Sequence, residues 1–188
     1  MKYRIRYIDL LIIFLVLTMG YVLFSGLTKE TTNNKASLST EKTVAAEEAT
    51  IISVSVLDEV IGVGEQCTIS IAVEPNKAIA GMQFDMNFDP SLVSADNIEE
   101  GDLLTQDGAS IYFNSGVIDN ESGTITGVYG AIVSPGESVS TGGTFAIITL
   151  TIGATKSICP LTLSNVIVGD LKGISVPVKL VNSKVAIS

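Results

Sequence analysis

Histidine and tryptophan are both absent from this 188-residue sequence. Without histidine the chain has no imidazole, which excludes Ser/His and Cys/His catalytic arrangements and histidine-ligated zinc. The two cysteines are too few for a four-thiolate zinc site or an iron–sulfur cluster. Positive charge is also scarce, because 11 Lys and Arg face 20 Asp and Glu and the net charge is -9. A chain of that sign is unsuited to neutralising phosphates, so we expect no nucleic-acid partner.

The acidic residues are concentrated in the C-terminal part of the chain. Residues 51–188 contain five lysines, no arginine and fifteen acids, whereas residues 1–30 have a net positive charge. Apolar residues make up 46% of the sequence and charged residues only 16%, which is too apolar for a chain that is disordered throughout. The composition therefore predicts a globular C-terminal domain with an acidic surface.

The N-terminus contains a long apolar run. From Leu10 to Leu27 there are 18 residues without a charge, and as a helix they would cover about 27 Å, the thickness of a bilayer core. Basic residues precede the run, at Lys2, Arg4 and Arg6. We expect residues 1–27 to be a signal-anchor that crosses the cell membrane once through residues 10–27, with a cytoplasmic N-terminus and an extracellular domain. A cleaved secretory signal is the alternative.

Residues 28–50 form a polar segment in which Leu38 and Val44 are the only large apolar side chains. Such a segment cannot bury enough apolar surface to offset the entropy lost on ordering. We expect it to be a flexible linker, and the domain to span residues 51–188.

From residue 51 onward, apolar residues alternate with polar or small ones in short segments separated by turn-forming residues. The segments lie at 52–58, 67–73, 82–88, 110–114, 124–132, 144–152, 161–168 and 174–181. Eight or nine short strands of this kind, with no apolar repeat of helical period, predict an all-β sandwich or barrel.

Neither an active site nor a metal site emerges from the acidic residues. The densest acidic group, at residues 99–102, has the composition of a solvated turn, and no second domain is available to form a catalytic cleft. Residues 119–122 could offer oxygen atoms to calcium, but the same residues are typical of a polar hairpin turn. We expect a protein that is not an enzyme and that has no catalytic residue, metal or cofactor.

The two cysteines, Cys67 and Cys159, leave two alternatives open. In an exported domain they can form a disulfide, which would close a loop of about 90 residues and contribute roughly 4 kcal/mol. Two separate buried thiols explain the same positions equally well.

The most specific local pattern lies between residues 79 and 104. Ala80-Gly81 is followed by apolar residues at 82, 84, 86 and 88, then by Asp89-Pro90, and later by the sequence GDLL at 101–104. This order and spacing resemble the early part of a cohesin domain, the receptor module of cellulosome-type assemblies. Residues 63–73 and 143–150 are similar to two further strands of that family. The resemblance extends over about residues 51–188.

The resemblance implies a nine-stranded jelly-roll β-sandwich that binds a dockerin module of a partner protein on one sheet face. In that case the chain is a non-catalytic docking module, the partner is a candidate polysaccharide-degrading enzyme, and this chain meets polysaccharide only indirectly. Calcium is expected in the dockerin. An Asn and an Asp that commonly contact the dockerin correspond to Gly81 and Gln83 here. The contact residues carried over by position are Gly81, Gln83, Asp85, Asn114, Tyr129, Ala131, Val168, Asp170 and Leu171.

A carbohydrate-binding module is the main alternative, because such modules share the sandwich architecture; a general surface-adhesion domain is another. Sugar-binding faces normally expose coplanar aromatic rings. After residue 50 the only tyrosines are Tyr112 and Tyr129, and Phe113 alternates with Tyr112 so that these two neighbours cannot share a face. The sequence therefore favours the docking module over the carbohydrate-binding module.

Overall fold

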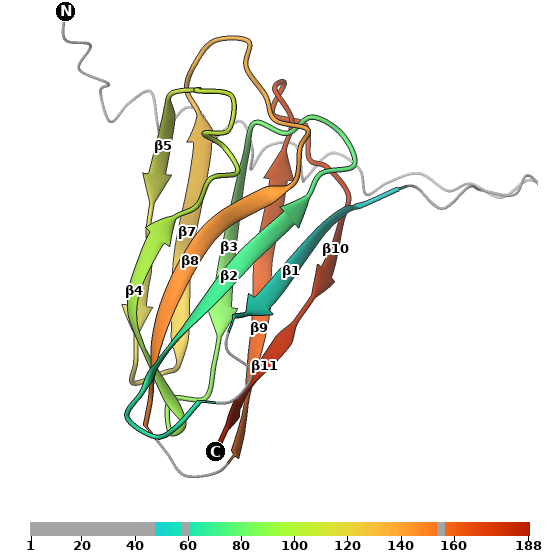
Figure 1. Cartoon of the computed structure of the whole chain (residues 1–188). Helices are drawn as coiled ribbons and strands as arrows, with labels where there is room; N and C mark the ends of the chain where they lie inside the picture. Colours follow the sequence, from blue (N-terminus) through green and yellow to red (C-terminus); the bar gives the residue numbers. More distant parts are fainter. Residues whose placement is uncertain (1–47, 58–60, 154–156) are drawn as a thin grey trace, which may run out of the picture. The chain divides into compact units, whose positions relative to one another are not determined.

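The computed structural model describes residues 48–57, 61–153 and 157–188, and it contains strands and turns but no helix within these ranges. The strands form two β-sheets packed face to face (Figure 1). The all-β sandwich expected from the alternating pattern is confirmed. No helix long and apolar enough to cross a membrane occurs in the described ranges. The predicted transmembrane segment, residues 1–27, and nearly all of the predicted linker lie outside them.

The first sheet has five strands in the order β10-β1-β2-β8-β4. Its strands are β1 (Thr50–Val56), β2 (Gln66–Glu74), β4 (Val93–Glu100), β8 (Gly143–Ile152) and β10 (Val178–Val181). The second sheet has the order β11-β9-β3-β7-β5, and the short β6 also pairs with β7. Its strands are β3 (Gly81–Asn87), β5 (Ile111–Asn114), β6 (Val117–Asp119), β7 (Thr124–Ile132), β9 (Ser157–Gly169) and β11 (Ser183–Ile187).

The described ranges contain eleven strands where nine were expected. One addition is β4, an edge strand with a bulge between Ala95 and Asn97, so that its buried residues Val93, Ala95 and Ile98 do not keep period two. The short β6, between the predicted segments at 110–114 and 124–132, is a second addition, and β11 is a third. The predicted strand at 174–181 forms only from residue 178, and the chain then passes to the other sheet as β11.

The two ends of the domain are joined through both sheets. β10 runs parallel to β1, with Thr50 opposite Val178, while β11 pairs antiparallel with β9. Ile61 also bridges to Ile187. The last strands therefore close the sandwich on the side where its first strand enters.

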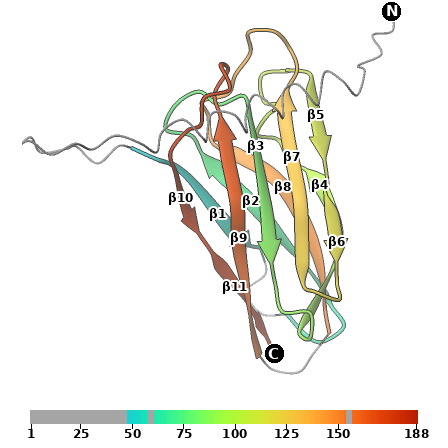
Figure 2. The same ribbon diagram turned by 180° about the vertical axis from the view of Figure 1, so that it is seen from behind.

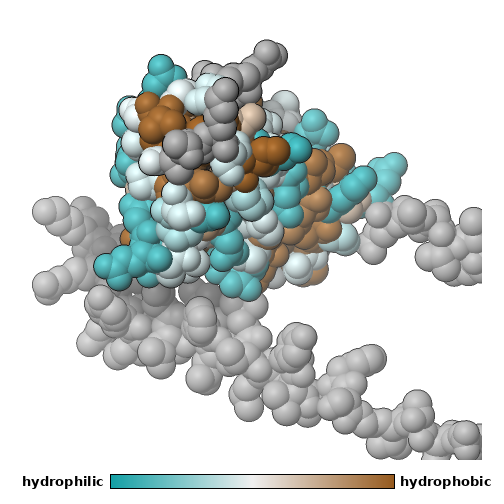
Figure 3. Space-filling view, turned by 90° about the horizontal axis from the view of Figure 1, so that it is seen from below, coloured by the Kyte–Doolittle hydropathy of each residue, from teal (hydrophilic) through white to brown (hydrophobic). Residues whose placement is uncertain are grey.

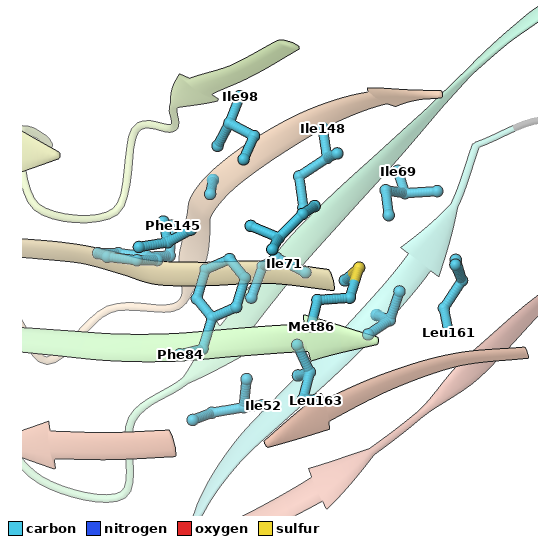
Figure 4. Close-up of a cluster of buried hydrophobic side chains, with 14 of the residues drawn as sticks. Ile52, Ile69, Ile71, Phe84, Met86, Ile98, Phe145, Ile148, Leu161 and Leu163 are labelled. Carbon is cyan, nitrogen blue, oxygen red and sulfur yellow. The ribbon is translucent and has the colours of Figure 1, made fainter. Parts of the chain in front are cut away.

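The core lies between the sheets and is built from the apolar residues of the period-two pattern. Figure 4 shows Phe84 and Met86 of β3 pointing into it, toward side chains of the facing sheet such as Ile71 and Ile148. The Phe84 ring meets Phe145 edge-on, with ring centroids 6.0 Å apart and planes at 75°. Because Met82, Phe84 and Met86 point into the core, the residues that alternate with them on β3 lie on the outer face of the second sheet.

The cysteines lie in different sheets, Cys67 in β2 and Cys159 in β9, and both are buried. Cys159 is a free thiol whose Sγ donates to the carbonyl of Pro160 over 3.7 Å. Burial raises the pKa of this thiol. Of the two alternatives that the sequence left open, a disulfide or two separate buried thiols, the thiol at Cys159 agrees with the second.

Candidate functional site

The candidate site is the outer face of β9, β3, β7 and β5, which Figure 2 presents toward the viewer. On β3 the side chains of Met82, Phe84 and Met86 are buried, and that of Gln83 is exposed. The strand register places two rows of outward residues side by side. The first is Ile167, Gln83, Tyr129 and Asn114, and the second is Gly169, Gly81, Ala131 and Tyr112.

Five of the nine predicted contact residues, Gly81, Gln83, Asn114, Tyr129 and Ala131, therefore lie together in these two rows. The prediction for Val168 is wrong, because this residue is 0% exposed and lies opposite the buried Met82. Its neighbour Ile167, which is 52% exposed, points outward instead. The error is one of phase, since a shift by one residue along a strand exchanges the inner and outer faces.

Asp85 lies on the outer face but is engaged with the two neighbouring strands. Both β7 and β9 carry an extra residue opposite this part of β3, and the register shifts there. At these bulges Gly127 and Asn165 have positive φ angles, 69° and 49°. The Asp85 carboxylate accepts the Gly127 N–H at 2.7 Å and the Asn165 amide at 2.5 Å. Asp85 therefore holds the bulges in place, a structural role that its position alone did not indicate.

Asn114 also has a local role. Its Oδ1 accepts the Gly116 N–H at 2.7 Å, which supports the turn between β5 and β6. Gly116 has a φ of 72°, a conformation that glycine adopts readily. Gln83 differs, because its nearest side-chain interaction is a long hydrogen bond to the Asn165 carbonyl at 3.4 Å. Gln83 is thus the more available polar side chain of the two.

Tyr112 and Tyr129 stand next to each other on this face. Their ring centroids are 5.8 Å apart, the ring planes are inclined by 30°, and the rings are 52% and 39% exposed. The hydrogen bond with the Tyr112 hydroxyl, together with partial burial, raises the pKa of Tyr129. Tyr112 was not among the predicted contact residues. Its pairing opposite Ala131 is a long-range contact between strands, which the sequence of β5 by itself does not reveal.

A groove of about 360 Å³ runs across the face at the row of Gly169, Gly81 and Ala131, which we call the small-residue row. The row leaves space because two of its members have no side chain. Ile167, Gln83 and Tyr129 line the groove beside the row, and Asp170 lies where β9 ends. Gln83 is its only uncharged polar side chain apart from the Tyr129 hydroxyl.

Asp170 and Leu171 belong to the turn that follows β9. The Asp170 carboxylate accepts the N–H groups of Lys172 and Ile174, each at 2.9 Å. Both contacts lower the pKa of Asp170, and the hydrogen bond from Ile174 has the larger effect. The Asp170 carboxylate therefore stays ionised to a lower pH than an ordinary aspartate does. It presents Leu171 and Ile174, both exposed, next to the groove.

The acidic hairpin at 119–122 is a turn, as its composition indicated. The Asp119 carboxylate accepts the N–H groups of Glu121 and Ser122, and contacts with Ser122 lower its pKa. Across residues 48–57, 61–153 and 157–188, no three Cys, Asp or Glu side chains are grouped so that they could hold a metal ion.

Exposed apolar side chains also occur at the end of the sandwich where β9 begins. They are Leu57 after β1, Val63 before β2 and Ile158 in β9. Figure 3 looks on to that end and shows hydrophobic residues in separate groups among hydrophilic ones. The outer face of β9, β3, β7 and β5 differs from it in having a groove framed by outward residues of adjacent strands.

The fold is an all-β sandwich in which one sheet presents an exposed, grooved outer face. The family model of the cohesin domain matches residues 52–187. The chain therefore belongs to the cohesin family, and the resemblance seen in its sequence is confirmed. No curated protein sequence matches it.

Several solved cohesin modules have a similar structure. One is the non-cellulosomal cohesin from the archaeon Archaeoglobus fulgidus, with 15% identity, a TM-score of 0.56, and coverage of 75% of this chain and 92% of that chain. Another is the cohesin of the OlpA–Doc918 type I cohesin–dockerin complex from Clostridium thermocellum, with 19% identity, a TM-score of 0.60, and coverage of 75% and 100%. A third is the second type II cohesin of the ScaA scaffoldin of Acetivibrio cellulolyticus, with 14% identity, a TM-score of 0.63, and coverage of 73% and 96%. At these identities the likeness shows a common fold.

Proposed function

We propose that this protein is a non-catalytic docking module that binds the dockerin module of a partner protein on the outer face of β9, β3, β7 and β5. The observation that carries the proposal is the groove at the small-residue row, framed by Tyr129, Ile167 and Gln83. Membership of the cohesin family supports it, as does the fold shared with cohesins solved in complex with dockerins.

The physical character of the face suits a protein partner. Standard interfaces bury about 800 Å² on each side, are centred on apolar and aromatic residues, and exclude charges from that centre. Here Tyr112, Tyr129, Ile167 and Leu171 supply exposed apolar area, and Gln83 supplies a polar group. In this proposal calcium belongs to the dockerin, the partner is a polysaccharide-degrading enzyme, and the chain itself uses no cofactor.

Removing a central aromatic side chain should weaken binding. We expect Tyr129→Ala to reduce the affinity for a calcium-loaded dockerin about 10- to 100-fold, since buried tyrosines are frequent hot spots. Leu180→Ala is the matched control, because Leu180 is 37% exposed, close to the 39% of Tyr129, but lies on β10 of the other sheet. The measurement is isothermal titration calorimetry with a panel that includes the Doc918 dockerin of Clostridium thermocellum and the dockerins of Acetivibrio cellulolyticus. Chelating calcium should abolish binding without moving the melting curve of this domain.

A carbohydrate-binding module is the second candidate, favoured by the side-by-side exposed rings of Tyr112 and Tyr129. It differs from the docking module in its ligand and in its independence of the dockerin's calcium. If none of the dockerins binds, while a polysaccharide binds and is lost on Tyr112→Ala, the docking proposal is wrong. A general surface-adhesion role would then compete with the carbohydrate-binding role.

We further propose that the domain is displayed outside the cell on a membrane anchor formed by residues 1–27. The support is the uncharged run of residues 10–27 with the basic residues before it. Fractionation should recover the full-length protein with membranes, and external protease should release an intact domain by cutting within residues 28–50. Recovery from the medium with a new N-terminus near residue 26 would show a cleaved signal instead.

A further inference from the structure

The groove on the outer face extends over three adjacent strands. The small-residue row crosses β9, β3 and β7, a distance of about 10 Å, or two spacings between hydrogen-bonded strands. An α-helix with its side chains is about 10–12 Å in diameter. The row of Ile167, Gln83 and Tyr129 borders the groove along its length.

Glycine occupies two positions of the row for different structural reasons. A Cβ at Gly81 would lie 2.8 Å from the carbonyl oxygen of Gly130 and 3.2 Å from the Cβ of Ala131, so packing within the sheet requires glycine there. A Cβ at Gly169 would meet nothing within 4 Å, and its φ is one that other residues adopt. Glycine makes a strand less stable than alanine does, and it often marks a bulge, a tight bend or a place where a ligand or another backbone approaches closely. What Gly169 provides is open space on the outer face.

The lining of the groove favours an uncharged occupant. Asp170 is its only charged residue, and one of its carboxylate oxygens already accepts two N–H groups of its own turn. The remaining lining consists of backbone, small residues, Met82, Ile132, Ile167, Gln83 and Tyr129. Burying a charged group there would leave it without a partner, whereas an apolar side chain would gain burial.

We propose that the small-residue row is a socket for one apolar side chain presented by an α-helix of the dockerin, and that Gly169 and Ala131 set which side chains fit. This inference rests on the proposed function and specifies how the docking face selects its partner. Gly81 offers no side chain to a partner, and Gln83 is the groove's only uncharged polar side chain apart from the Tyr129 hydroxyl. Selection in this chain therefore depends on shape at the row more than on a polar contact at Gly81.

Filling the socket from either side tests the proposal. Gly169→Leu and Ala131→Leu each place a side chain in the groove from a position on the outer face. We expect each to weaken binding of a dockerin recognised by the unaltered protein at least 10-fold, with Gly169→Ala causing a smaller loss. Gly153→Leu is the control, because a Cβ there is 3.6 Å from the nearest atom, an ordinary contact, and lies outside the groove. Thermal melting of every variant checks folding, and Ala131→Leu keeps the test valid if Gly169→Leu fails to fold.

The outcomes separate the socket from the docking proposal. The socket is supported if affinity falls in the order Gly, Ala, Leu at position 169 while Gly153→Leu binds normally. Truncating one apolar residue of the dockerin helix to alanine should also weaken binding to the unaltered protein. The same truncation should cause no further loss of affinity in Gly169→Leu. Unchanged binding by folded Gly169→Leu and Ala131→Leu overturns the socket and leaves the docking face intact. If the unaltered protein binds no dockerin in the panel, both proposals fall.

Discussion

Phe84→Ala is expected to lower the free energy of unfolding by about 3–5 kcal/mol, because it leaves a cavity in the centre of the core. Phe84 is 0% exposed and packs edge-on against Phe145. Urea titration followed by circular dichroism measures the loss. Phe84→Leu, which keeps most of the volume, is the matched variant and should cost clearly less.

The same substitution separates folding from binding. Phe84 points away from the outer face, so the folded fraction of Phe84→Ala should bind its partner with nearly unchanged affinity. Binding per mole of total protein should then decrease only as the folded fraction decreases. A melting curve equal to that of the unaltered protein would contradict the assignment of Phe84 to the core.

Asp85→Ala is expected to destabilise the domain by about 1–3 kcal/mol, while Gln83→Ala leaves stability nearly unchanged. Both residues lie on β3 and point outward, but only Asp85 accepts short hydrogen bonds from the bulges of β7 and β9. The pair forms its own control. Thermal melting gives the stabilities, and amide hydrogen exchange should become faster at Gly127 in Asp85→Ala.

Equal stabilities of the two variants would show that the Asp85 contacts contribute nothing. That outcome is expected if Asp85 is an ordinary surface residue, since surface substitutions usually change the free energy of unfolding by less than about 0.5 kcal/mol. The bulges explain why we expect otherwise. Each inserts an extra residue into its strand, and one carboxylate accepts both the Gly127 N–H of the first bulge and the Asn165 side-chain amide of the second.

The period-two pattern was sufficient to predict the fold, because burial imposes it wherever a strand is regular. It identified the inward residues of β3 and the segments of β2, β7, β8 and β9. It missed β4, where the bulge between Ala95 and Asn97 interrupts the period and polar residues face outward at the sheet edge. A local pattern cannot represent a strand whose regularity is broken by its partner.

The site was predicted less completely than the fold, because it depends on register between strands. Gly81, Gln83, Tyr129 and Ala131 were placed on one face from the resemblance, and they do lie together. The pairing of Tyr112 with Tyr129 and the outward phase of Ile167 required the three-dimensional arrangement. The one sequence signal for the outward direction of Ile167 is the alternation within β9, where Ile167 and the buried Val168 must face opposite sides.

The acidic edge of the first sheet has a consequence for how the domain behaves when many copies are crowded together. Strand β4 has a neighbour on one side only, β8, and its last residues Glu99 and Glu100 are both exposed. An unprotected edge strand can pair with the same edge of another molecule. Here such pairing would bring several carboxylates of two chains into register, and like charges opposite each other are unfavourable. Two copies that met along this edge would therefore repel each other instead of extending the sheet.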